Sequence, residues 1–188
     1  MDIALTFDAG SGAEYATTIL DELKAANLRC TIFVTGEFAA IYPDILKRIV
    51  ADGHEVGNHS YSHPDFLKLS AAEVQYQLVH TEETINAIAG VSTKPYFRFP
   101  YGNDSESLIN EVNANGYLCV RWAADTIDWD PNTTCEQIQA RVARGTAPGA
   151  IILMHLGSPQ EGQILPVLIQ SLQNQGYNIV TISELLSP

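Results

Sequence analysis

The sequence predicts an α/β fold built on a mainly parallel sheet. Short apolar runs rich in β-branched or aromatic residues alternate with amphipathic helical patterns along the whole chain. The connections between them are short, which favours right-handed crossovers between parallel strands. With 188 residues, 46% of them hydrophobic, the chain is long enough for one well-packed domain and too short for two ordinary ones. We therefore expect a single domain over residues 1–188.

Seven strands are predicted. In chain order they span residues 3–8, 30–35, 55–58, 96–98, 117–122, 150–155 and 178–182. Strand-helix units of this kind build either an open doubly wound sheet or a closed barrel, and periodicity does not separate the two. The chain falls just under the roughly 200 residues or more of an eight-stranded barrel, so a barrel here would be short and irregular.

Six helices are predicted between the strands, over residues 13–26, 37–51, 71–89, 104–115, 135–144 and 164–175. Several of their boundaries carry stop signals, namely Asn27, Gly53, Gly90, Gly116 and Gly176. Ser70 is followed three residues later by Glu73, which predicts a capping box at the start of the third helix.

The composition limits the classes of partner. A net charge of −12 opposes binding to nucleic acids or anionic membrane surfaces and suits a neutral or cationic polymer. No apolar run approaches the roughly 20 residues needed to cross a bilayer, so we expect no membrane insertion. The first strand begins at Ile3 without a basic segment before it, so no signal peptide is expected. On that basis the chain is either intracellular or a trimmed catalytic domain.

Five polar motifs each follow an apolar run. They are Thr6–Gly10, His59–His63, Arg98–Tyr101, Asp125–Trp129 and Leu153–His155. Functional groups of parallel α/β folds collect at the carboxyl ends of the strands, so these motifs are expected to converge on one pocket. The chain has no GxSxG motif of a serine esterase, and Gly10-Ser11-Gly12 lacks the lysine of a phosphate-binding loop.

His59 and His63 form the strongest pair of candidate metal ligands. Pro64 disfavours a helical conformation at His63, so the pair is expected on a turn after the third strand. Taken alone, the pair also fits two surface or capping histidines. Asp8 and His155 each end an apolar strand; Asp8 also fits a helix N-cap, and His155 also fits a hydrogen-bonded core histidine.

Arg98 and Asp128 are charged residues in apolar, aromatic surroundings, where an unpaired charge is unfavourable. We predict that Arg98 pairs with Asp8 and holds it ionised, and that Asp128 pairs with His155, fixes its tautomer and raises its pKa. The alternative is a purely structural ion pair between Arg98 and one of the aspartates.

Two aromatic residues are expected to line the pocket. Tyr101 and Trp129 suit stacking on a sugar ring or walling off a small acyl group, although Trp129 also fits a core position. The turn at Pro100-Tyr101-Gly102 could present a backbone N–H to an oxyanion.

The five motifs, in this order and across nearly the whole chain, resemble the NodB-like polysaccharide deacetylases, carbohydrate esterase family 4. The resemblance implies a distorted, irregular (β/α)7 barrel related to the TIM barrel. It also implies hydrolysis of N- or O-acetyl groups on an acetylated polysaccharide or oligosaccharide such as chitin, peptidoglycan or acetylxylan. The implied cofactor is a divalent metal, zinc first, with cobalt, manganese or nickel as alternatives. The implied location is extracellular or associated with the cell wall.

The resemblance also assigns a role to each matching residue. Asp8 becomes the base, Arg98 the residue that orients it, His155 the acid and Asp128 its partner. The remaining roles are metal ligands for His59 and His63, and substrate contacts for Tyr101, Trp129 and Leu153.

Ala9 is the main departure from the family pattern, which usually has a second aspartate there as a metal ligand. Three interpretations are open. Water or Asp8 completes the metal shell of an active enzyme, the chain is a degenerate member that binds sugar without turnover, or Ala9 is an engineered inactivating change. Glu14 and Asp125 are weaker candidates for a substitute ligand. Retention of the other positions favours activity.

Overall fold

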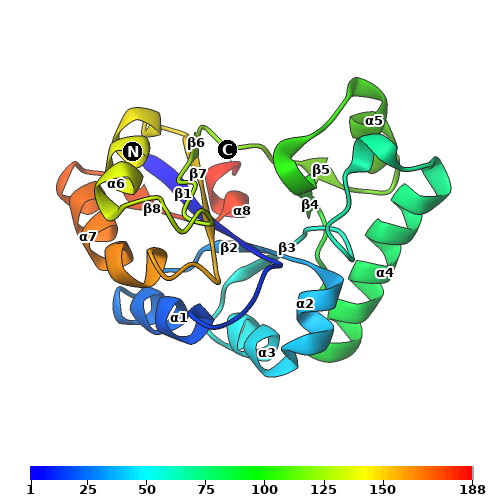
Figure 1. Ribbon diagram of the computed structural model, residues 1–188, viewed down its shortest axis with the longest axis horizontal. Coiled ribbons are helices and arrows are strands. Elements are labelled where there is room, and N and C mark those ends of the chain that lie inside the picture. The colour runs from blue at the N-terminus through cyan, green and yellow to red at the C-terminus, as the bar shows by residue number, and fades with distance from the viewer. Residues whose placement is uncertain (188) are drawn as a thin grey trace.

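The computed structural model describes residues 1–187. Its strands are β1 (Asp2–Ala9), β2 (Thr31–Val34), β3 (Glu55–Asn58), β4 (Tyr96–Phe97), β5 (Leu118–Cys119), β6 (Ala124–Asp125), β7 (Ile151–His155) and β8 (Asn178–Ile179). They form one sheet in the order β5-β4-β3-β2-β1-β7-β6, with β8 beside the start of β1, and every pair is parallel. The sheet curves as a half-barrel inside an arc of helices (Figure 1). The predicted parallel α/β fold is confirmed.

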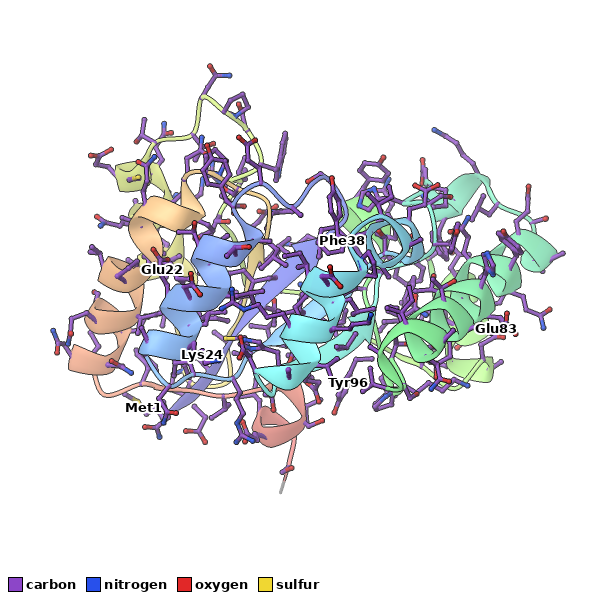
Figure 2. All side chains as sticks on the ribbon, turned by 90° about the horizontal axis from the view of Figure 1, so that it is seen from below. Met1, Glu22, Lys24, Phe38, Glu83 and Tyr96 are labelled. Carbon is purple, nitrogen blue, oxygen red and sulfur yellow. The ribbon has the colours of Figure 1, made fainter. Side chains whose placement is uncertain are left out.

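The helices cover the outer face of this curved sheet, except α8, which packs on the inner face. They are α1 (Ala16–Ala25), α2 (Gly36–Ile41), α3 (Pro43–Ala51), α4 (Ala71–Ala89), α5 (Glu106–Ala114), α6 (Cys135–Gly145), α7 (Glu161–Asn174) and α8 (Ile182–Leu185). Figure 2 shows α7, α1, α3 and α4 side by side. The predicted span of α4 is confirmed, with its capping box at Ser70 and Glu73 and its left-handed Gly90. Within residues 1–187 no helix is long and apolar enough to cross a membrane.

Three predicted elements were wrong in part. The helix expected over 37–51 is split into α2 and α3, because Pro43 starts a new helix after Tyr42 leaves helical geometry. The strand expected over 117–122 is reduced to β5, and the separate strand β6 follows it. The strand expected over 178–182 ends at Ile179, because Thr181 and Glu184 form a capping box that starts α8.

Apolar residues cover both faces of the sheet and leave the carboxyl ends of the strands for the functional site. On the outer face, Ile3, Leu5 and Phe7 of β1 are buried against the helices. On the inner face, Ala4 and Phe33 pack against Ile182 of α8. The Ile182 N–H donates to Thr31 Oγ1 at the start of β2, so α8 lies at the end where the strands begin. The carboxyl ends of the strands lie at the opposite end, where the polar motifs stand.

Candidate active site

The pairing register of the strands brings the polar motifs together. Asp8 of β1 is aligned with His155 of β7, two residues beyond the aligned pair Thr6 and Leu153. Asp125 of β6 is aligned with the same Leu153. Because side chains alternate between the two faces of a sheet, these five residues point to the inner face in two tiers. Asp8 and His155 form the upper tier, nearest the open end.

The two residues of the upper tier line a cavity of about 430 Å³. It is lined by Asp8, Gly10, Ser11, His59, His63, Phe99, Tyr101, Trp122, Asp125, Trp129, Leu153 and His155. Seven of the nine predicted site residues are in this set, and the other two, Arg98 and Asp128, are buried behind it. Trp122 was missed, although an aromatic residue at the end of a predicted strand was the signal that could have found it.

Asp8 is held by Arg98 as predicted. Arg98 is fully buried; its Nη1 donates to Asp8 Oδ1 at 2.8 Å and its Nη2 donates to Thr6 Oγ1 at 2.9 Å. The Phe33 ring lies 4.1 Å from the guanidinium carbon. Burial by itself would raise the pKa of Asp8, but the charges of His59, Arg98 and His155 outweigh it and hold that pKa below its usual value. Asp8 is therefore ionised near neutral pH.

The predicted pair of Asp128 and His155 is also present. Asp128 is buried; its Oδ1 lies 2.7 Å from His155 Nδ1 and its Oδ2 accepts the His155 backbone N–H at 2.9 Å. The Thr126 hydroxyl donates to Oδ1 as well, at 2.9 Å. Burial would lower the pKa of His155, but the hydrogen bond and charge of Asp128 raise it. The arrangement places the proton on Nδ1 and leaves Nε2 for chemistry in the cavity.

Replacement of Asp128 by asparagine is expected to move the alkaline limb of the pH-activity profile to lower pH. An acid must be protonated to act, so activity falls as the pH rises through the pKa of His155. The Asp128 carboxylate raises that pKa, and removing its charge lowers it. The profile of kcat against pH for both proteins measures the shift. An unmoved alkaline limb would assign the acid to another group.

His59 and His63 lie on a turn, as predicted. His63 has a left-handed φ of 56° and its N–H donates to Ser60 Oγ. The rings of the two histidines lie 4.9 Å apart between centroids. His59 Nδ1 is 2.9 Å from the Arg98 carbonyl oxygen, so Nδ1 carries the proton, and Nε2 stands 3.3 Å from Asp8 Oδ2. Burial lowers the pKa of both rings, that of His63 to about 4, so both stay neutral at pH 7.

Two neutral imidazoles fit a divalent metal, and His59 has the tautomer expected of a ligand, because metal-binding histidines usually donate their other ring N–H to a carbonyl or carboxylate. A third side-chain ligand is not supplied. Over residues 1–187 no group of three or more His, Cys, Asp or Glu side chains could hold an ion. Glu14 is exposed, and Asp125 does not complete such a set. Ala9 is fully buried within the apolar cluster that faces the helices. The donor set is therefore His59 and His63, beside the Asp8 carboxylate.

The aromatic residues form the rim of the cavity. Tyr101 is 67% exposed and Trp129 is 60% exposed, so the alternative of a core position for Trp129 was wrong. Leu153 is buried below them. Tyr101 has a left-handed φ of 60°, and its N–H donates to no group among the described residues. The rim thus combines two exposed rings with one free backbone donor.

Gly57 leaves room for the Phe33 ring that lies against Arg98. Gly57 of β3 is aligned with Phe33, and a Cβ there would lie 2.5 Å from Phe33 Cδ1. Gly57→Ala must therefore displace the ring that packs on Arg98, and it is expected to lower the free energy of unfolding by about 1–3 kcal/mol. Urea denaturation measures this, with Gly162→Ala as control, since a Cβ at that helical position makes only ordinary contacts. Equal stability of the two variants would contradict the packing argument.

Comparison with known proteins places this chain in a family. A sequence model described as polysaccharide deacetylase matches residues 1–120. The chain belongs to the polysaccharide deacetylase family. A peptidoglycan-N-acetylglucosamine deacetylase of Bacillus cereus is 37% identical over 185 residues, which cover 96% of this chain and 66% of that protein. The chain thus spans slightly less than two thirds of the length of this relative.

Solved structures of this family share the fold. A wild-type protein of Bacillus anthracis, described as a pseudoenzyme of carbohydrate esterase family 4, is 33% identical with a TM-score of 0.92 and covers 98% of this chain and 65% of its own. A mutant described as the same pseudoenzyme with restored enzymatic activity is 34% identical with a TM-score of 0.93, and the match covers 98% of this chain and 67% of that one. The irregular (β/α)7 barrel that the family resemblance implied is therefore confirmed.

Proposed function

We propose that this chain is a metal-dependent deacetylase that removes acetyl groups from an N-acetylglucosamine polymer such as peptidoglycan or chitin, with acetylxylan as the ester alternative. One observation carries the proposal. Asp8 and His155 are aligned on neighbouring strands, each has its own buried counterion, and both open into the same cavity beside two neutral histidines. Two proton-transfer groups with pKa values moved in opposite directions suit one base and one acid.

The residues divide the reaction between them. Asp8 accepts the proton of the attacking water, and protonated His155 delivers a proton to the leaving nitrogen. The Tyr101 N–H donates to the oxygen that becomes negative in the transition state. A divalent ion held by His59 and His63 would polarise the acetyl carbonyl and lower the pKa of water. Leu153 offers an apolar contact to the acetyl methyl group, and the rings of Tyr101 and Trp129 suit stacking on sugar.

A second candidate function is binding of the polysaccharide without turnover. Ala9 favours it, because the family usually has a metal-ligating aspartate there, and so does the similarity to a pseudoenzyme. The intact pairs Asp8 with Arg98 and His155 with Asp128 favour catalysis, since a binding protein needs neither. The names of relatives support an extracellular or cell-wall location for the substrate, and we propose the same location for this chain.

Acetate release decides between the two. The purified protein is incubated with N-acetylglucosamine oligomers, peptidoglycan and acetylxylan, after chelation and after addition of zinc, cobalt, manganese or nickel. We expect release that depends on added metal. Binding of the polymers without acetate release under any metal would favour the alternative, and full activity in the chelated protein would contradict the metal requirement.

A further inference from the structure

Asp125 faces the cavity and is not used in the mechanism above. It ends β6, is half-buried and lines the cavity. Its Oδ1 accepts the Ile127 N–H at 2.8 Å, which fixes the turn that leads to Asp128. Its Oδ2 has no hydrogen-bond partner among residues 1–187. One carboxylate oxygen thus builds the turn, and the other is left for a ligand.

The position of Asp125 is close to the reacting groups. It is aligned with Leu153, two residues before His155 on the same face of the sheet. Its charge also contributes to the pKa of both His155 and Arg98. The other carboxylate that lines the cavity, Asp8, has Oδ1 bonded to Arg98 and Oδ2 beside His59. Asp125 Oδ2 is therefore a carboxylate oxygen that is free to accept a hydrogen bond from a substrate close to His155.

The chemistry of a carboxylate distinguishes two classes of acetyl group. An ionised carboxylate only accepts hydrogen bonds. The scissile nitrogen of an acetamide carries an N–H donor, whereas the corresponding oxygen of an acetyl ester carries only lone pairs. His155 protonates the leaving atom, which is nitrogen in the amide and oxygen in the ester. A hydrogen-bond acceptor beside His155 therefore attracts the amide N–H and repels the ester oxygen. A hydrogen bond from a substrate to an ionised group changes the ratio of kcat/KM between that substrate and an analogue without the donor by about 10- to 100-fold.

We propose that Asp125 is a specificity-determining residue that accepts the N–H of the scissile acetamide and selects N-acetyl over O-acetyl groups. The inference rests on the proposed function and goes further by naming the class of bond. Asp125 exchanges no proton in the reaction. His155 supplies the proton that the nitrogen gains when the carbon–nitrogen bond breaks, and the original N–H stays on the amine.

Asp125→Asn tests this with little structural change. The amide oxygen of asparagine can still accept the Ile127 N–H, while an NH₂ donor replaces the free carboxylate oxygen. With zinc present, kcat/KM on an N-acetylglucosamine tetramer is expected to fall about 10- to 100-fold, whereas kcat/KM on acetylxylan oligomers should stay level or rise, because the variant removes the acceptor that repels the ester oxygen. Asp130→Asn, which removes the same charge from the same loop, is the control and should change neither. Equal losses on both substrates would overturn the proposal and assign Asp125 a purely electrostatic effect on His155.

Binding supplies a measurement that does not depend on turnover. Calorimetry on the metal-free protein compares an N-acetylglucosamine tetramer with a xylose tetramer, which has no acetamido group. Asp125→Asn is expected to weaken binding of the first by about 10-fold and to leave the second unchanged. Unchanged binding of the first would contradict the proposed contact. Wild-type protein that releases no acetate would refute the proposed function, and the binding comparison would still decide the role of Asp125.

Discussion

Replacement of His155 by alanine is expected to lower kcat at least about 100-fold, because loss of a positioned proton donor removes a contribution of that size or more. The ring Nδ1 and the backbone N–H of His155 each make a hydrogen bond to Asp128, and the imidazole faces the cavity that Asp8 also lines. Water is a poor substitute for it, since the leaving amine must be protonated while the bond to carbon breaks. Steady-state acetate release with zinc present measures the loss.

Two further measurements separate a catalytic role of His155 from a structural one. Zinc affinity should be nearly unchanged in His155→Ala, because the proposed ligands are His59 and His63. Added imidazole should restore part of the activity if only the proton donor is missing. His80→Ala, on α4 outside the cavity lining, is the control and should retain wild-type turnover. Wild-type turnover in His155→Ala would remove the residue from the mechanism.

The parts of the fold that were predictable depend on local signals. The helix over 71–89 has a capping box at one end and a glycine at the other, and its span was predicted to the residue. The two ion pairs were predictable for a different reason. Arg98 and Asp128 stand in apolar sequence, and burial forces each to find an opposite charge among the few other buried ionisable residues.

The parts that were not predictable depend on distant contacts. The strand β6 has only two residues, and its pairing with β7 defines it more than its composition does. The contact between Phe33 and Arg98 requires Gly57 on the next strand, which no local pattern reveals. The sequence offers Asp125 as a candidate metal ligand, but the strand register places it near His155, and among residues 1–187 it belongs to no group of three candidate ligands.

Ala9→Asp is expected to strengthen zinc binding, since it adds an anionic ligand to a donor set of two neutral imidazoles. Loss of a residue that hydrogen-bonds to a metal ligand typically lowers metal affinity about 10- to 100-fold. A new side chain that binds the metal directly should therefore raise the affinity by at least about the same factor. The structure adds an expectation about stability. Ala9 is fully buried in the apolar cluster, so an unpaired carboxylate there should lower the free energy of unfolding of the metal-free protein by about 3 kcal/mol.

Zinc should reverse that loss, because coordination compensates the buried charge. Calorimetric titration of the metal-free proteins gives the affinities, and thermal unfolding with and without zinc gives the stabilities. Ala9→Asn matches the size of the new side chain without its charge, so it should gain much less affinity. A destabilised Ala9→Asp protein with wild-type zinc affinity would mean that the carboxylate stays among the apolar residues facing the helices. Equal affinity and equal stability would mean that another group already completes the metal shell, and the donor set of two histidines would be wrong.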